Sequence, residues 1–436
     1  MSFQQGLSGL NASSKNLDVI GNNIANSATY GAKSSRAEFQ DVYAGALNGA
    51  GANLVGIGTS LATVAQQFTQ GNITTTESPM DLAINGGGFF QLSDGLNPVE
   101  YSRNGQFKVS RDGYIVNNNN LKLLGYPADG SGIVQPGLAQ PLKLPTSGIA
   151  PKTTSEITTE FNLDSRAKVT APDGGGIDMK SPKTYNNATS LTAYDAKGQD
   201  VAVTLYFQKG PTDPTDGSTT WNVFATANGT PFETDSEGAA IALDDSGNPT
   251  TPYTTITFPA NGGSPIAPTT KINMDIPPGK NAQGADTLGI AGVKFDMLGA
   301  TENGSGFAVT NLTQNGYAPG QLAGILIENS GIVMARYSNG QSKPAGQVEL
   351  ASFRNPQGLQ PMGGNVWART FASGEAVVGV PGDGNMGKLQ SGALEESNVD
   401  LTAELVNMVT AQRAYQANAQ TVKTQDQVLQ TIVNLR

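Results

Sequence analysis

The sequence contains neither cysteine nor histidine in its 436 residues. Without cysteine there are no disulfides and no thiolate metal sites, and without histidine there are no imidazole zinc sites and no nucleophile-histidine triads. We therefore predict no catalytic residue, no cofactor and no bound metal. The chemistry least hampered by these absences is that of a secreted glycosidase with two carboxylates. No stretch singles out such a pair among the 36 acidic residues.

Charge and long apolar runs are also scarce. Only 14% of the residues are charged, and their charges sum to −10. A basic face is typical of proteins that bind nucleic acid or anionic membranes, so we expect neither partner. No run approaches the roughly 18 apolar residues of a membrane span, and residues 1–30 do not resemble a secretory signal. We expect no membrane insertion.

The C-terminal stretch differs from the rest of the chain. Residues 397–436 contain no glycine or proline, although the whole sequence has 54 glycines and 24 prolines. Ser397 and Asp400 have the spacing of a capping box, so we predict that a helix starts there. Apolar residues recur along it every seven positions, with others four positions later, which indicates one stripe. The predicted assembly residues of this helix are Leu401, Leu405, Met408, Tyr415, Val422, Leu429 and Val433.

The opposite face of this helix is rich in amides. Residues 397–436 include ten Asn or Gln and only six charged side chains. A helix of this length reaches roughly 60 Å, which suits a coiled coil. Because amides hydrogen-bond to neighbours, we expect contacts on several sides.

The N-terminus carries a second apolar stripe, with only Lys15 and Asp18 charged in residues 1–26. Its predicted assembly residues are Phe3, Leu7, Leu10, Leu17, Ile20 and Ile24. One interpretation is that both terminal helices simply cover a globular core. The low charge around them favours another, in which they pair with each other or stay disordered until further copies cover their apolar surface.

The middle of the chain has a β pattern. Asn104-Gly105 and Asp112-Gly113 separate short apolar runs and favour type I′ turns in a β meander. The stretch "MDLAINGGGFFQL" predicts a strand, a glycine bend and a strand, and it lacks the lysine and helix of a phosphate-binding loop. From about residue 146 to 314, alternating runs rich in threonine and glycine predict a β sandwich or barrel. Acidic loops such as "LDDSGNPT" lack the full ligand set of a calcium site, so we interpret them as solvated turns.

After Gly316 the strand pattern resumes, with Ser338-Asn339-Gly340 as a turn. We predict a multidomain α+β protein in which N- and C-terminal α-helices form a coiled-coil-like pair and an all-β core domain contains an inserted all-β domain. The expected domains are a terminal helical domain at 1–30 and 395–436, a linker at 31–70, a β-rich core at 71–146 and 315–394, and the insert at 147–314.

Three stretches in order resemble the bacterial flagellar axial proteins of the rod and hook. They are "GLSGLNASSKNLDVIGNNIANSATYGAKSSRAEF", "DLAINGGGFFQL" with "YSRNGQFKVSRDGYIVN", and "GALEESNVDLTAELVNMVTAQRAYQANAQTVKTQDQVLQTIVNLR". The resemblance covers residues 1 to about 146 and about 315 to 436. The large insert and the closing "QDQVLQTIVNLR" favour a hook member over the shorter distal rod member.

The resemblance implies a structural, non-enzymatic subunit that self-assembles into an extracellular tube of the flagellum. It implies export through the flagellar type III apparatus, an inner tube of paired helices, a middle shell formed by the core and an outer shell formed by the insert. It also implies contacts with rod, hook cap and hook-filament junction proteins, and a universal-joint role in transmitting motor torque. The alternatives are a distal rod protein or a secreted β-rich adhesin.

Overall fold

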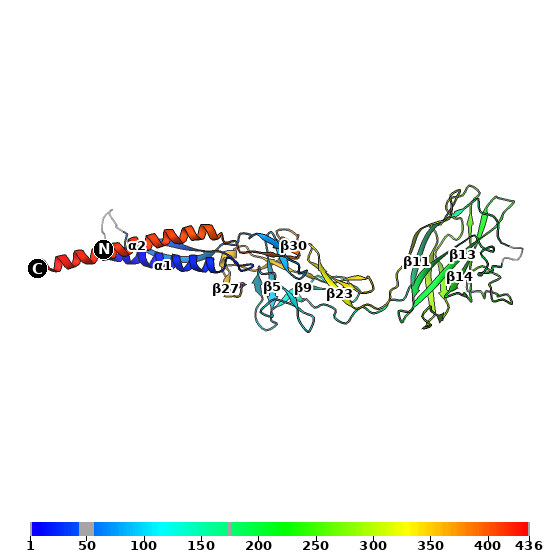
Figure 1. The fold of residues 1–436 in the computed structure, drawn as a ribbon, viewed down its shortest axis with the longest axis horizontal. Coiled ribbons are helices and arrows are strands. Elements are labelled where there is room, and N and C mark those ends of the chain that lie inside the picture. Colours follow the sequence, from blue (N-terminus) through cyan, green and yellow to red (C-terminus); the bar gives the residue numbers. More distant parts are fainter. Residues whose placement is uncertain (1, 43–55, 172–175, 435–436) are drawn as a thin grey trace. The chain divides into compact units, whose positions relative to one another are not determined.

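The computed structural model describes residues 2–42, 56–171 and 176–434. The chain forms two compact units (Figure 1). Unit 1 contains Met1–Thr146, Ala323–Arg336 and Ser342–Arg436, and unit 2 contains Ser147–Leu322 and Tyr337–Gln341. The two terminal helices and the β-rich remainder predicted from the sequence are both present.

The helices lie at the two ends of the chain. α1 spans Ser2–Ala25 and α2 spans Leu401–Asn434. The Asp400 side chain caps α2, because its Oδ1 accepts hydrogen bonds from the backbone N–H groups of Thr402 (2.9 Å) and Ala403 (3.1 Å). These bonds satisfy two of the donors that every helix N-terminus leaves free.

The predicted capping role of Ser397 is wrong. Its hydroxyl oxygen accepts a hydrogen bond from the backbone N–H of Val399, which precedes the helix. The intervening Asn398 side chain accepts from the Ser34 N–H (2.7 Å) and donates to the Gln67 carbonyl (2.8 Å). Because Asn398 is tied to these distant segments, residues 397–399 stay outside the helix.

A β-hairpin follows α1. β1 (Ser35–Val42) pairs antiparallel with β2 (Gly58–Gln66), and a bulge interrupts the register between Glu38 and Phe39. The sequence predicts a linker at 31–70 and does not predict this hairpin. Much of its glycine-rich stretch, residues 43–55, lies outside the described residues.

One large sheet dominates the β part of unit 1. Its 13 strands follow the order β23, β24, β25, β9, β5, β6, β28, β27, and β7, β8, β10, β26 and β29 are attached beside this path. The strands are β5 (Phe89–Ser93), β6 (Glu100–Ser102), β7 (Lys108–Val109), β8 (Ile115–Val116), β9 (Lys122–Pro127), β10 (Gln140–Pro141), β23 (Leu322–Ile327), β24 (Ile332–Tyr337), β25 (Ser342–Val348), β26 (Leu350–Ser352), β27 (Gln360–Gly363), β28 (Val366–Ala368) and β29 (Val377–Gly379). A short 3-10 helix, η1, spans Pro356–Gly358.

Strands from the two ends of the β region pair with each other. β3 (Ile73–Thr75) pairs antiparallel with β31 (Ala393–Glu395), and β4 (Leu82–Asn85) pairs antiparallel with β30 (Lys388–Ser391). The segment that follows the β1–β2 hairpin therefore runs beside the segment that leads into α2.

Two apolar clusters stabilise the β part of unit 1. The larger one contains Leu82, Ile84, Phe90, Leu92, Phe107, Ile115, Leu123, Leu142, Leu144, Ile327, Val333, Val348, Leu350, Val366 and Leu389. The smaller one contains Phe89, Tyr101, Ala351, Phe353, Leu359 and Trp367. Both clusters combine residues from before 146 and after 322, so the two halves of the chain share one core.

Unit 2 consists mainly of two five-stranded sheets. One contains β11 (Glu156–Asp164), β17 (Ile272–Ile276), β20 (Ile290–Asp296), β21 (Thr301–Asn303) and β22 (Ala308–Gln314). The other contains β12 (Asn187–Tyr194), β13 (Asp200–Thr212), β14 (Thr219–Ala227), β15 (Thr230–Pro231) and β16 (Thr254–Phe258). β18 (Gly279–Lys280) and β19 (Asp286–Thr287) form a separate pair. Side chains from both large sheets, including Phe161, Phe207 and Trp221, make one buried cluster.

Several turns share an Asp-x-x-Gly-x pattern. In four of them the first aspartate accepts hydrogen bonds from the backbone N–H groups two and four residues later, and the glycine has a φ between 78° and 89°. These aspartates are Asp129, Asp195, Asp235 and Asp244. Only glycine adopts such a φ readily, and the carboxylate holds the turn through these hydrogen bonds.

These turns predict an acid-sensitive stability. The backbone N–H groups of Ile133 and Asn248, respectively, hold the pKa values of Asp129 and Asp244 below the usual 3.8. A depressed pKa in the folded state stabilises the protein above the unfolded pKa, and this stabilisation is lost as the pH falls through the folded pKa. We expect Asp244→Asn to lower the melting temperature of unit 2 at pH 7, and the difference from the parent chain to shrink as the pH falls through the lowered folded-state pKa of Asp244. A difference that persists unchanged at pH 2.5 would contradict this.

At two positions where the sequence predicts a type I′ turn, the structure differs from the prediction. Asn104-Gly105 is not a hairpin turn, because β6 pairs with β5 and β28 rather than with β7. A Cβ at Gly105 would lie 1.6 Å from the Leu82 carbonyl oxygen, so the glycine permits close backbone approach. At Asp112-Gly113 a hairpin does join β7 to β8, but only Gly113 has a positive φ, of 85°. The predicted turn at Gly340 and the bend at Gly86 are confirmed.

Candidate functional site

The described residues contain no group of three or more acidic or histidine side chains placed to hold a metal ion. Neither α1 nor α2 has an apolar stretch long enough to cross a membrane. The features that stand out are the two terminal helices, the β1–β2 hairpin, and the joint where both meet the β part of unit 1.

α1 and α2 lie side by side and run antiparallel (Figure 1). Small residues on α1 let the helices come close: a Cβ at Gly6 would lie 2.9 Å from Val422 Cγ2, and one at Gly9 would lie 2.9 Å from the Asn418 amide. A larger side chain at either glycine would push the helices apart. We call this contact the helix interface.

Polar side chains fix the register of the helix interface. Near one end, the Asn418 amide donates to Ser13 Oγ at 3.4 Å. Near the other, Asn23 Nδ2 donates to Glu404 Oε1 at 3.1 Å. Amide-rich helices therefore contact each other partly through hydrogen bonds, which is consistent with the predicted role of the amides.

The structure places the predicted assembly residues in three different environments. Ile20 is buried, and Leu10, Leu17, Ile24, Met408 and Val422 are partly buried. Six are exposed, namely Phe3, Leu7, Leu401, Leu405, Tyr415 and Leu429. The side chain of Val433 lies outside the described residues.

Sequence periodicity did not identify the second row of the helix interface on α2. The prediction added residues four positions after the sevenfold repeat, such as Leu405. The residues that face α1 include Glu404 and Asn418, and the deeply buried residue nearby is Ala411. Glu404, Ala411 and Asn418 each lie three positions after a residue of the sevenfold repeat, which is the a-to-d spacing of a heptad. Because these residues are small or polar, an apolar pattern could not reveal them.

The hairpin packs on α1. Ser8 Oγ accepts a hydrogen bond from the Thr59 N–H at 3.3 Å. The Asn23 side chain forms two hydrogen bonds with the Ser35 backbone. Its Oδ1 accepts from the Ser35 N–H (2.8 Å), and its Nδ2 donates to the Ser35 carbonyl (2.7 Å). Thus α1 contacts α2 on one side and the hairpin on another. Phe39, Leu61 and Val64 of the hairpin remain exposed.

Three charged side chains are buried together at the joint between the helices and the β part. Glu395 Oε1 accepts from Lys33 Nζ (2.6 Å), and Glu395 Oε2 accepts from an Arg103 guanidinium nitrogen (3.0 Å). The backbone N–H of Gly71 also donates to Oε1, at 2.9 Å. Lys33 and Glu395 have no exposed side-chain surface. We call Lys33, Arg103 and Glu395 the joint cluster.

Burial dominates the electrostatics of the joint cluster. It lowers the pKa of the Lys33 ammonium, although the Glu395 carboxylate acts in the opposite direction. Burial lowers the pKa of the Arg103 guanidinium in the same way. Two cations share one anion, so Glu395 is the group on which both depend.

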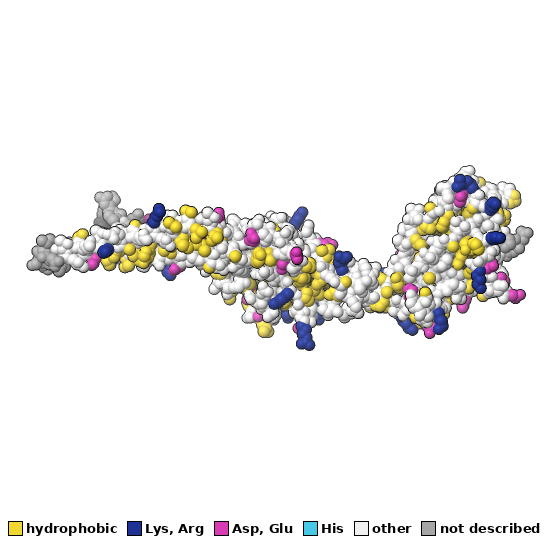
Figure 2. Space-filling model, viewed as in Figure 1, with side chains coloured by type: hydrophobic (Ala, Val, Ile, Leu, Met, Phe, Trp, Pro, Cys, Tyr) yellow, Lys and Arg dark blue, Asp and Glu magenta, His cyan; other side chains and the backbone are white. Residues whose placement is uncertain are grey.

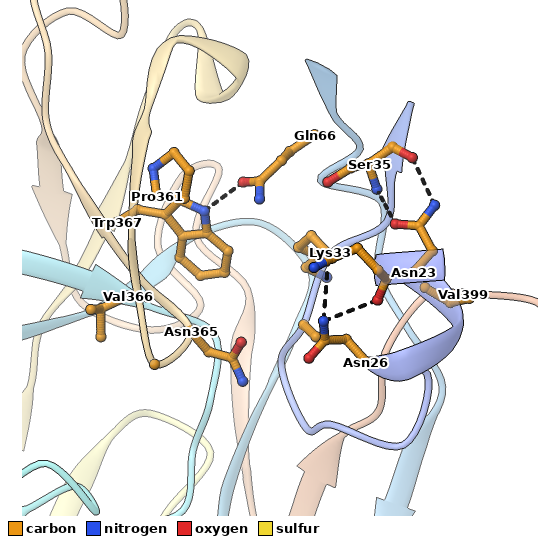
Figure 3. Close-up of a pocket in the computed structure, with 14 residues that line it drawn as sticks. Asn23, Asn26, Lys33, Ser35, Gln66, Pro361, Asn365, Val366, Trp367 and Val399 are labelled. Carbon is orange, nitrogen blue, oxygen red and sulfur yellow. Dashed lines mark hydrogen bonds between the residues drawn. The ribbon is translucent and has the colours of Figure 1, made fainter. Parts of the chain in front are cut away.

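A cleft of about 360 Å³ lies beside the joint cluster (Figure 3). Asn23, Asn26 and Lys33 line one side, and Asn365 and Trp367 line the other. The Trp367 indole N–H donates to Gln66 Oε1 at 2.6 Å, and the Asn26 amide donates to the Asn22 carbonyl at 3.0 Å. The cleft offers amide groups and a lysine that is already paired with Glu395, so its lining suits polar contacts.

Hydrophobic side chains lie along the surface of the helical part (Figure 2). The large exposed ones are Phe3, Leu7, Leu401, Leu405, Val406, Val409, Tyr415, Val428 and Leu429. Contiguous apolar surface of this kind marks interaction sites in soluble proteins.

Four families match successive parts of the chain. "Flagella basal body rod protein" matches residues 3–33, and "Flagellar hook protein FlgE/F/G D1 domain" matches residues 83–171. "Flagellar basal body protein FlaE D2 domain" matches residues 162–317, and "Flagellar basal body rod FlgEFG protein C-terminal" matches residues 390–435.

Several relatives match this chain over its full length. The chain is 42% identical to the flagellar hook protein FlgE of Salmonella typhimurium and 40% identical to that of Escherichia coli, with all of both chains covered in each case. It is 30% identical to FlgE of Borreliella burgdorferi, covering 100% of this chain and 99% of that protein. The resemblance noted in the sequence is confirmed, and the chain belongs to the flagellar hook protein FlgE family.

Proposed function

We propose that this chain is a non-enzymatic subunit of the flagellar hook that polymerises through its terminal helices. The observation that carries the proposal is the set of large apolar side chains left exposed on α1 and α2. The helices contact each other through small and polar residues, so much of their apolar surface is free for other copies.

In this proposal the paired helices, residues 1–30 and 395–436, form a coiled-coil-like inner tube. The heptad spacing of Glu404, Ala411 and Asn418 supports it. Residues 71–146 and 315–394 form a middle shell, and residues 147–314 form an outer shell as an inserted β domain. Separate buried clusters for the two β regions support this division. Residues 31–70 link the inner tube to the middle shell.

The proposed assembly stands outside the cell as part of the flagellum. Its partners are further copies of the chain, the rod, the hook cap, the hook-filament junction proteins and the type III export apparatus. The tube transmits motor torque to the filament while bending. Polar shell surfaces with few charges suit contacts that are individually weak and easily remade, while the helices hold the subunits together.

Three rival functions have less support. The distal rod, adhesin and glycosidase readings predict relatives of other names, whereas the full-length relatives here are hook proteins. An adhesin would also leave the apolar outer faces of α1 and α2 without a role.

The proposal predicts that exposed apolar residues of α1 are needed for polymerisation. Phe3→Ser with Leu7→Ser removes side chains that other copies would bury, at a cost of about 1 kcal/mol each, since both are already more than half buried in the single chain. The critical concentration for polymer formation should therefore rise about 30-fold. Sedimentation after salting-out measures it, with electron microscopy to identify tubes.

Leu96→Ser is the matched control, since Leu96 is exposed on the β part of unit 1. It should leave the critical concentration unchanged. If the double variant polymerises like the parent chain, or if the parent chain forms no tubes at all, the proposed function is wrong.

A further inference from the structure

The layered arrangement of the helical part leaves apolar surface on two sides. α1 contacts both α2 and the β1–β2 hairpin, so it is the central element. On the hairpin, Phe39 (39% exposed), Leu61 (37%) and Val64 (44%) form what we call the hairpin face. A two-stranded hairpin is marginally stable unless its apolar surface is covered.

The three hairpin residues share one side of the ladder. Phe39 is directly opposite Leu61, and Ala37 is directly opposite Val64. Residues 37, 39 and 41 alternate along β1 and therefore lie on one face. Asp41 thus ends the hairpin face with a negative charge.

α2 carries a second uncovered stripe near its start. Leu405 (47% exposed) and Val409 (48%) follow Leu401 at intervals of four residues, and Arg413 continues the row. We call Leu401, Leu405 and Val409 the α2 stripe. It lies about a third of a turn from the row that faces α1, which includes Glu404 and Ala411. The α2 stripe thus ends with a positive charge.

We infer that the hairpin face of one copy packs on the α2 stripe of a second copy, with Asp41 next to Arg413. The inference rests on the proposed function, because it takes another copy of the chain as the occupant.

Length and charge both support the match. Residues 37–41 span about 13 Å of strand, and residues 405–413 span about 12 Å of helix. Asp41 and Arg413 are exposed, and neither forms an ion pair with any other described residue. Two opposite charges at matching ends of two apolar surfaces would set the register of the contact.

The geometry also explains an open polymer. The two surfaces differ, so each copy offers one hairpin face and one α2 stripe. A heterologous contact of this kind does not close in a dimer, because each added copy still offers a free surface. It generates a ring if the rotation between copies closes and a helical filament if it does not.

A charge-reversal series tests the register. Asp41→Arg or Arg413→Asp alone should raise the critical concentration about 5-fold, and the two together should restore it. High salt should reduce both single effects. If the double variant is no better than the worse single variant, the assigned pair is wrong.

A cross-link tests the contact itself, because the chain has no cysteine of its own. With Asp41 next to Arg413, Phe39 would lie opposite Val409, so a chain with Phe39→Cys and Val409→Cys, oxidised mildly as a polymer, should yield a ladder of disulfide-linked copies. Oxidation of the dilute monomer should yield none. A polymer of this variant that gives no ladder would overturn the inference and leave the proposed function intact.

Phe39→Ser with Leu61→Ser completes the series, and Phe371→Ser is its control, since Phe371 is fully exposed on the β part. The critical concentration of the hairpin variant should be at least about 10-fold higher than that of the control, and the melting temperature of its monomer should be unchanged. Equal polymerisation of the two would contradict the inference. Failure of the unmodified chain to polymerise would instead refute the proposed function.

Discussion

Replacement of Glu395 by glutamine is expected to lower the free energy of unfolding of unit 1 by about 3–5 kcal/mol. The glutamine leaves Lys33 and Arg103 buried next to each other without the carboxylate that both contact. A buried charge that loses its partner costs far more than a lost surface ion pair. Urea unfolding measures the change, with the fluorescence of Trp367 as the signal for unit 1 and Trp221 replaced by phenylalanine.

Lys33→Met is the informative comparison for Glu395→Gln. It removes one of two cations and leaves Arg103 paired with Glu395 at 3.0 Å. The methionine also fills much of the space of the lysine stem. Lys33→Met should lower the free energy of unfolding of unit 1 by much less than Glu395→Gln does. If Lys33→Met proves the more damaging of the two, the two-cation account of the joint cluster is wrong.

Phe207→Ala is expected to destabilise unit 2 by about 3–5 kcal/mol. The Phe207 side chain has no exposed surface, and its ring centroid lies 4.6 Å from that of Phe161 and 5.9 Å from that of Phe307. Alanine would leave a cavity between the two sheets. In a Trp367→Phe background, the fluorescence of Trp221 follows the unfolding of the same core.

Phe207→Leu is the control for cavity formation. Leucine keeps most of the volume of the phenylalanine side chain, so this substitution should lower the stability of unit 2 by less than about 1.5 kcal/mol. Neither substitution should move the unfolding midpoint of unit 1, because Phe207 belongs to the cluster of unit 2 alone. A comparable shift in unit 1 would mean that the two units do not unfold independently.

The terminal helices and the β-rich middle were predictable because each depends on local pattern. Residues 397–436 lack glycine and proline, and the Asp-x-x-Gly-x turns carry their own hydrogen-bond acceptors. The exact start of α2 was not predictable, since Asn398 is held by Ser34 and Gln67, more than 300 residues earlier in the chain. A tertiary contact there overrides the local capping signal.

The hairpin was missed because glycine-rich sequence at residues 49–58 masked the strands on either side of it. The exposed Phe39 and Leu61 also break the usual rule that apolar strand residues are buried. Pairing of Phe39 with Leu61 is visible only in the folded structure.

The joint cluster carries no sequence signal at all. Lys33 and Glu395 are 362 positions apart, and Arg103 and Glu395 are 292 positions apart. Isolated charged residues in a sequence are usually solvated, so nothing marked these three as buried. The pairing of β3 with β31 places Glu395 opposite Ile73, and tertiary contacts bring Lys33 and Arg103 to it from the segments after α1 and β6.

The glycines of the helix interface bear on the order in which the molecule is completed. Gly6 and Gly9 each cost α1 about 1 kcal/mol of helix propensity, so this segment gains most of its stability from α2. Its partner residues Val422 and Asn418 come near the far end of the chain. During synthesis, Gly6 and Gly9 are made long before Asn418 and Val422, so this part of α1 gains the contacts that stabilise its helix only after α2 has been made.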